Sequence, residues 1–219
     1  HRWAKGSIQT ALKILPAVLR RPGLGWFRKA EAVLHLTHYS IHPVIVTMTL
    51  LVLPLLLWGS FTFKPWVIIP LLVMMVISMA APSTLYLFSQ QAAYRQWRGK
   101  IRYLPVLVAL GMGLAVNNTK GVLGALLSRT KGEFVRTPKL GSLAEKEGGG
   151  PAGGDRRAYR IPLDWLCLLE VFLGAWALAA FATYLSLFKF LIGPILLLHA
   201  IGFLFVGTVS LVHARRFEP

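Results

Sequence analysis

Four long blocks of apolar residues constrain this chain more than any other feature of its sequence. Each block, as an α-helix, is about 30 Å long or more, which matches the hydrocarbon core of a bilayer. The blocks are Ile41–Phe63, Trp66–Phe88, Trp165–Tyr184 and Phe190–Val212. The chain is also 55% hydrophobic and only 15% charged. These features predict an all-α integral membrane protein and argue against a soluble domain.

Short polar turns pair the four blocks into two hairpins, so we expect about four transmembrane helices. Lys64 and Pro65 separate the first two blocks, and residues 186–189 separate the last two. Of the 24 Lys and Arg residues, all but Lys64 and Lys189 then lie on one side of the membrane. This positive-inside bias places both ends of the chain in the cytoplasm, and it explains the net charge of +16 without nucleic acid.

Three further segments are amphipathic or too short to cross, and we expect them at the membrane surface. Ala4–Leu19 and Trp26–Thr37 have apolar residues at helical spacing, and Pro16 should kink or interrupt the first. Ile101–Val116 is apolar but only about 24 Å long as a helix. If it crossed, the basic residues after it would lie outside, so we expect an interfacial or re-entrant segment. Asn117-Asn118-Thr119 should cap a short amphipathic helix that reaches about Ser128.

The expected organisation has five segments. They are interfacial helices (1–39), a transmembrane hairpin (40–94), an interfacial or re-entrant segment (95–130), a basic loop with a mobile Gly-rich linker (131–162) and a second hairpin (163–219). The single cysteine, Cys167, allows no intrachain disulfide. We expect the chain to be part of a longer protein, because it begins at His1 without a signal-like region.

Ionisable residues near the apolar blocks have two interpretations each. His35, His38 and His42 follow one another at spacings of three and four, which suits a metal-binding helix face. The same spacing suits interfacial histidines at the start of a membrane span. Glu170 lies about 9 Å along the helix from Asp164, so it either faces protein or a water-filled path, or extends back to the surface.

Polar residues late in the second block indicate a possible sugar channel. Tyr86, Ser89 and Gln90 offer hydroxyl and amide partners together with an aromatic face. Hydrogen bonding between helices explains the same residues. The chain contains no phosphate-binding glycine motif and no paired-carboxylate motif. We therefore expect no complete catalytic site within it.

Two short motifs resemble those of a known family. His1-Arg2-Trp3-Ala4-Lys5-Gly6 is similar to the end of the Gln-x-x-Arg-Trp motif of membrane-embedded family 2 glycosyltransferases, the cellulose synthase and glucomannan synthase-like group. Phe134-Val135-Arg136-Thr137-Pro138-Lys139 resembles the family's gating loop, Phe-x-Val-Thr-x-Lys, with Arg136 in place of Val. The order of interfacial helix, two spans, interfacial segment, gating loop and two spans is also similar, and it covers the whole chain.

The resemblance implies an inverting hexosyltransferase that extends a β-linked polysaccharide and passes it through the membrane. The donor would be a nucleotide sugar of the UDP-glucose or GDP-mannose type. Arg2 would bind the diphosphate and Trp3 would stack on the acceptor sugar. The gating loop would close over the nucleotide with Phe134, Arg136, Thr137 and Lys139. The family's catalytic base and its Asp-x-Asp motif, which binds Mg or Mn, would lie upstream, so no catalytic residue or metal ligand is expected here.

The expected partners are the nucleotide sugar, the polysaccharide acceptor, membrane lipids and accessory subunits, and no nucleic acid. We expect a bacterial inner membrane, with the gating loop in the cytoplasm. A transporter or membrane subunit without enzymatic activity, whose basic loops bind lipid, is the alternative function. A histidine-based membrane metalloenzyme is a third interpretation. Because Arg136 departs from the family pattern, the sugar and linkage stay open among β-glycans.

Overall fold

The computed structural model describes residues 2–59, 64–127, 165–187 and 192–216, and every regular element in these ranges is a helix. Three helical stretches are long and apolar enough to cross a membrane: Trp26–Trp58, Trp165–Ser186 and Gly193–Ala214. The bent pair Trp97–Gly113 and Ala115–Leu127 would add a fourth if it counts as one span. The predicted all-helical fold is confirmed, and the apolar helices indicate a membrane protein.

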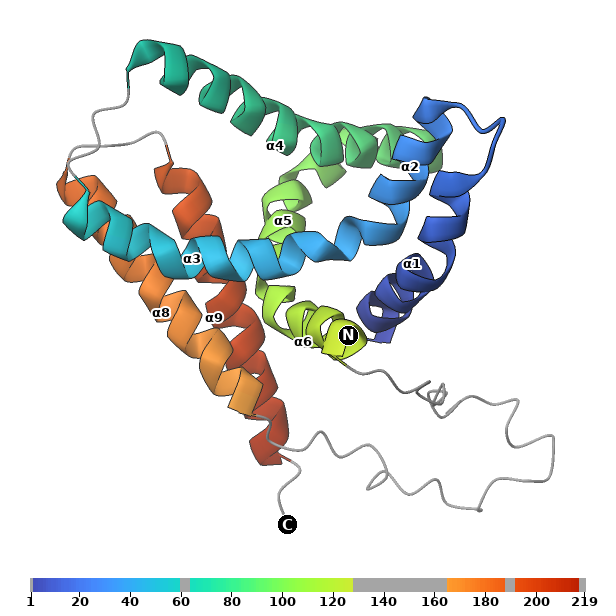
Figure 1. Cartoon of the computed structure of the whole chain (residues 1–219). Coiled ribbons are helices and arrows are strands. Elements are labelled where there is room, and N and C mark those ends of the chain that lie inside the picture. Colours follow the sequence, from blue (N-terminus) through green and yellow to red (C-terminus); the bar gives the residue numbers. More distant parts are fainter. Residues whose placement is uncertain (1, 60–63, 128–164, 188–191, 217–219) are drawn as a thin grey trace.

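The centre of the fold is the antiparallel hairpin of α8 (Trp165–Ser186) and α9 (Gly193–Arg216) (Figure 1). Its turn is closed by the Tyr184 hydroxyl, which accepts a hydrogen bond from the Ile192 amide over 3.1 Å. α3 (Ile41–Trp58) packs across α8, and the Trp176 indole donates to the Leu50 carbonyl oxygen over 3.1 Å. The core shared by these three helices contains Val52, Leu53, Leu56, Ala180, Phe181, Tyr184 and Leu196.

α5 (Leu104–Gly113) lies against α9 at backbone contact distance, because glycines occupy the crossing. A Cβ atom on Gly202 would overlap the Ala109 carbonyl oxygen, and one on Gly113 would overlap the Gly202 carbonyl oxygen. Small residues allow this kind of approach between helices in membranes. The residues expected at the interface or in a re-entrant segment therefore form the end of η2 (Trp97–Tyr103), all of α5 and the start of α6 (Ala115–Leu127).

A bend of 41° separates the η2–α5 stretch from α6, and this is the geometry of a broken span or a re-entrant loop. α6 then packs against α3 and α1 rather than against α9. The bend therefore directs the chain from the α8–α9 hairpin toward its N-terminal helices (Figure 1). Two residues directly after the bend, Ala115 and Val116, are buried in a core that also contains Leu166, Leu173 and Phe203.

α1 (Arg2–Arg20) and α2 (Trp26–Thr37) form a smaller hairpin. Gly23 adopts a φ of 78° in the turn, a left-handed conformation that glycine accepts without steric cost. The Ser7 hydroxyl donates to the Leu36 carbonyl oxygen over 3.0 Å and holds the open end of the hairpin together. The interruption expected at Pro16 is not seen, since α1 is continuous. Its buried face, Ala4, Ile8 and Ala11, packs ahead of the proline and supports the helix.

The helices formed by the first two apolar blocks begin within one residue of the predicted starts, but they end at other residues than predicted. After η1 (His38–Ser40), α3 begins at Ile41 and ends at Trp58, and residues 60–63 are outside the described ranges. α4 (Pro65–Ala93) begins with proline, which suits the first position of a helix, and continues five residues past Phe88. Its most extensive contact within the described ranges is with η2 (Figure 1).

Candidate functional site

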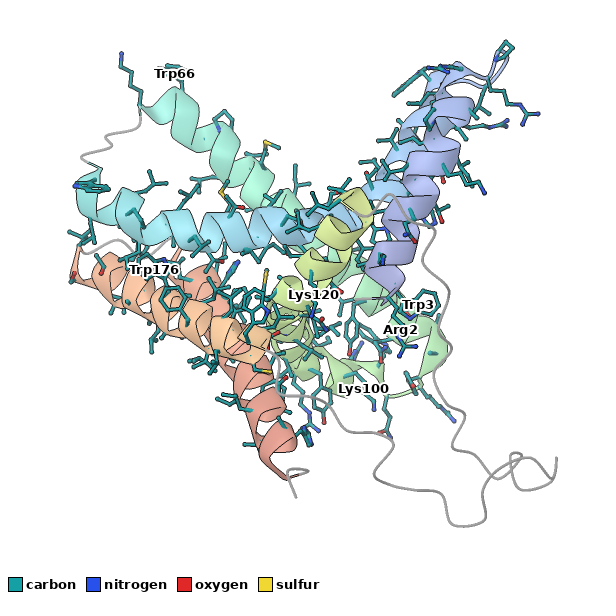
Figure 2. The ribbon with its side chains drawn as sticks, turned by 60° about the horizontal axis from the view of Figure 1, so that its bottom comes forward. Arg2, Trp3, Trp66, Lys100, Lys120 and Trp176 are labelled. Atoms are coloured by element: carbon teal, nitrogen blue, oxygen red, sulfur yellow. The ribbon has the colours of Figure 1, made fainter. Side chains whose placement is uncertain are left out.

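Arg2 and Trp3 form the first turn of α1, and both side chains are exposed, Trp3 by 85%. The very next residue, Ala4, is completely buried. Ala4 and Ile8 belong to a core cluster with two residues of α6, Val122 and Ala125, and Tyr39 packs against it. Figure 2 shows Arg2 and Trp3 projecting from this end of α1. The packing of α1 against α6 thus fixes the position of the backbone from which the Arg2 and Trp3 side chains project.

The C-terminal end of α6 lies at the same place. Ala125 is two residues from Leu127, the last residue of α6, after which the chain continues into residues 128–164. The gating-loop residues are Phe134, Arg136, Thr137 and Lys139, and all four lie outside the described residues. About seven residues separate Leu127 from Phe134, a length of at most about 25 Å when extended. The structure therefore brings Arg2 and Trp3 near the end of α6, the last described element before the second motif.

Cations and aromatic rings alternate along η2 and just before it. Each of three cations lies over a neighbouring ring, an arrangement typical of the boundary between membrane and water. The pairs are Arg98 over Trp97 at 5.7 Å, Lys100 over Tyr94 at 5.2 Å and Arg102 over Tyr103 at 5.0 Å. The Arg102 guanidinium also donates to the Tyr103 hydroxyl over 3.0 Å. The pattern marks η2 as a candidate surface anchor, which the sequence analysis did not identify.

The candidate channel residues lie in the last part of α4, toward η2. Tyr86 and Gln90 are half-buried, and Ser89 is exposed. Because residues three and four apart are neighbours on a helix, these three side chains form one polar row. The hydroxyl of Thr84, on the preceding turn, donates to the Ala80 carbonyl oxygen over 2.7 Å and so is satisfied within α4.

The three neighbouring histidines do not lie on one continuous helix, although the His35 and His38 rings are close, with centroids 6.2 Å apart. α2 ends at Thr37, and the 3₁₀ turn η1 changes the helical register before α3 begins. His35 is exposed, and His38 Nδ1 donates to the His35 carbonyl oxygen over 2.7 Å. The Tyr39 ring lies between His38 and His42, at centroid distances of 4.1 Å and 5.8 Å.

His42 instead contacts α6. The Asn118 amide donates to His42 Nε2 over 3.0 Å, although 76 residues separate the two in sequence. The prediction that Asn117 caps a helix is therefore wrong: α6 already begins at Ala115, so the polar run lies inside its first turns. His42 Nδ1 and the Thr119 hydroxyl are buried, and neither has a hydrogen-bond partner within the described part of the chain. This polar contact between helices had no signal in the local sequence pattern.

Glu170 is 4% exposed in α8, and its Cβ lies beside Gly207 of α9. Of the two expected positions, the one facing protein is therefore observed. Cys167, one turn earlier, is buried as a free thiol. Within the described ranges no group of three or more His, Cys, Asp or Glu side chains is arranged to hold a metal ion.

Comparison of the chain with protein-family models, curated proteins and solved structures finds no match. Its function has to follow from the residues and their arrangement.

Proposed function

We propose that this chain is the C-terminal membrane part of an inverting family 2 glycosyltransferase. The full enzyme would transfer a hexose from a nucleotide sugar to a growing β-linked polysaccharide and pass the polymer across the membrane. One observation carries the proposal. The exposed Arg2 and Trp3 lie beside the end of α6, from which the chain continues into residues 128–164, and this placement supports a site shared with the second motif.

The chemistry of these residues suits a nucleotide sugar and its acceptor. A guanidinium such as Arg2 makes two parallel hydrogen bonds to phosphate oxygens. Trp3 offers an exposed aromatic face for a sugar ring. Lys139 and Arg136 supply positive charge where the nucleoside diphosphate leaves, which favours departure of that group. Closure of Phe134 and Thr137 over the nucleotide would exclude water from the reaction.

The proposed topology has four spans, α3, α4, α8 and α9, with both chain ends and the loop after α6 in the cytoplasm of a bacterium. Two hairpins require four helix ends on the same side of the membrane. Figure 1 shows toward one side the end of α3, the start of α4, the end of α8 and the start of α9. The cation–aromatic pairs of η2 suit the cytoplasmic surface. In this topology α1 and α2 lie in the interface, and the α5–α6 pair is re-entrant.

The polar row of α4 then has a role in polymer movement. Tyr86, Ser89 and Gln90 end on the same cytoplasmic side as η2 and would offer hydrogen bonds to sugar hydroxyls. The catalytic base and the Asp-x-Asp motif that binds Mg or Mn would belong to a domain upstream of residue 1. Accessory subunits would complete the export path.

Two substitutions in the full-length protein test the site. Trp3→Ala and Lys139→Ala should each remove most polymer synthesis from UDP-glucose or GDP-mannose while leaving expression unchanged. Trp66→Ala, which changes another exposed tryptophan at the far end of α4, and Lys131→Ala, in the same loop, serve as matched controls. Synthesis should stay near normal in both controls.

Near-normal synthesis in both site variants would reject the site. Substrate flux through reconstituted protein without any nucleotide sugar would instead support the transporter.

A further inference from the structure

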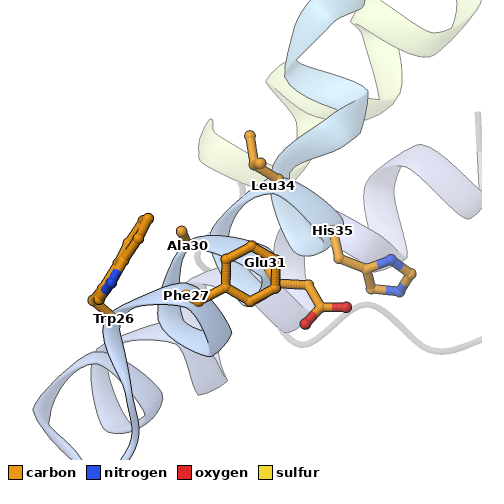
Figure 3. A pocket seen from close by; sticks show the side chains of 6 residues that line it. All are labelled: Trp26, Phe27, Ala30, Glu31, Leu34 and His35. Carbon is orange, nitrogen blue, oxygen red and sulfur yellow. The ribbon is translucent and has the colours of Figure 1, made fainter. Parts of the chain in front are cut away.

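A hollow of about 620 Å³ lies on α2, away from the α1–α6 contact (Figure 3). Its lining consists of two rows of side chains that repeat every four residues, Trp26, Ala30 and Leu34 in one row and Phe27, Glu31 and His35 in the other. Residues four apart lie one above the other on a helix, so the rows run side by side along one face. None of the residues of α2 is buried, so this face has no cover within the described part of the chain.

The shape of the hollow comes from one small residue between large ones. Ala30 leaves a gap between Trp26 and Leu34, which are exposed by 77% and 72%. Trp26 and Phe27 meet edge to face, with ring centroids 6.0 Å apart and an interplanar angle of 87°, and form one end. Such a site is mostly apolar and aromatic, with few polar groups, as ligand sites usually are.

The hollow is lined by a negatively charged residue, whereas the chain as a whole is positively charged. The chain has 24 basic and 8 acidic residues, and Lys29 and Arg28 belong to the same helix. Neither of these cations lines the hollow, whereas the Glu31 carboxylate does. An anionic headgroup would therefore be repelled at Glu31, and a cationic one would be attracted both by the carboxylate and by the faces of Trp26 and Phe27.

The position of α2 next to a candidate membrane span indicates that the cation belongs to a lipid headgroup. α2 is the start of Trp26–Trp58, the first of the stretches long and apolar enough to cross a membrane. Tryptophan at such an end lies at the level of the headgroups. We propose that the hollow binds one zwitterionic phospholipid, with its ammonium group at Glu31 and the two aromatic rings, and an acyl chain along Ala30 and Leu34. The His35 ring is placed on the same row as Glu31 to donate to the lipid phosphate.

This inference is independent of glycosyl transfer, and lipid binding tests it directly. Purified protein in detergent is titrated with phosphatidylethanolamine and with phosphatidylglycerol of the same acyl chains, and bound lipids are counted by native mass spectrometry. We expect one phosphatidylethanolamine to be retained in preference to phosphatidylglycerol. Glu31→Gln should weaken its retention about five- to tenfold, by removing the ionic and charge-assisted contact. Ala30→Leu should weaken it comparably, by filling the gap.

Lys29→Gln is the matched control, because it changes a charge on the same helix outside the hollow. It should leave phosphatidylethanolamine retention unchanged. Equal or stronger retention of phosphatidylglycerol would overturn the proposal, and so would unchanged retention in Glu31→Gln. An equal loss in Lys29→Gln and Glu31→Gln would also overturn it, since the effect would then come from the charge of α2 as a whole. Glu31 is exposed, so its substitution does not disturb the core.

Discussion

Replacing Gly202 with alanine should separate α5 from α9. A Cβ atom at this position would overlap the Ala109 carbonyl oxygen and would lie 3.0 Å from the Gly113 nitrogen. Both are backbone atoms, so no side-chain rotation relieves the overlap, and the helices have to move apart. The movement of α9 would disturb Phe203, the next residue, which is completely buried in a core with residues of α6 and α8.

The size of the effect follows from two opposing terms. Overpacking of a close-packed contact costs roughly 1–3 kcal/mol, and a contact with backbone belongs at the upper end. Alanine gains about 1 kcal/mol over glycine in helix propensity. We therefore expect Gly202→Ala to lower the free energy of unfolding by about 2 kcal/mol, which is about 30-fold in the unfolding equilibrium.

Gly111→Ala is the matched control. Gly111 lies in α5 between Ala109 and Gly113, two residues from each and so on the other side of the helix, and a Cβ there meets nothing within 4 Å. This variant should gain up to about 1 kcal/mol from propensity alone. The two variants should thus differ by about 3 kcal/mol in equilibrium unfolding by SDS in mixed micelles, followed by helical circular dichroism. Equal stability of the two would show that the α5–α9 backbones do not meet at Gly202.

Two smaller predictions concern polar contacts between helices. Trp176→Phe keeps an aromatic ring but removes the indole N–H that donates to the Leu50 carbonyl oxygen, so it should cost about 0.6–1 kcal/mol in the same unfolding assay. Trp58→Phe, at a residue 91% exposed, should cost nothing measurable; a loss as large as that of Trp176→Phe would contradict the assignment. Asn118→Ala removes the amide that donates to His42 Nε2 and should cost about 1 kcal/mol. A double-mutant cycle with His42→Ala checks this, because strictly additive losses would mean that the pair does not interact.

The apolar blocks were sufficient to predict which segments become the long helices. α8 begins at Trp165 as predicted and ends two residues beyond Tyr184, since continuous apolar sequence leaves little choice of structure in a membrane. Pro65, which was expected in the turn before the second block, is instead the first residue of α4, a position that suits proline. Pro16 shows the limit of such local rules, because α1 continues through it to Arg20 without the interruption that was one of the two expected effects.

Contacts between distant segments were not predictable from periodicity. Ile101–Val116 is apolar on every side, so its pattern does not show which face meets α9. Gly113 and Gly202 become informative only when the crossing is known. The pairing of His42 with Asn118 likewise depends on how α3 and α6 are arranged, 76 residues apart. At the candidate site, the sequence motif identified Arg2 and Trp3, but only the packing of α1 relates them to the end of α6.

The burial of Ala4 against α6 also has a consequence for the order of biosynthesis. About 120 residues separate Ala4 from Ala125, and α3 and α4 lie between them. Because synthesis proceeds from the N-terminus at roughly 5–20 residues per second, α1 leaves the ribosome seconds before its docking surface on α6 exists. The apolar face of α1, with Ala4, Ile8 and Ala11, lacks this contact until α3, α4 and α6 have all been synthesised. Arg2 and Trp3 therefore reach their final position relative to α6 only after the intervening helices have left the ribosome.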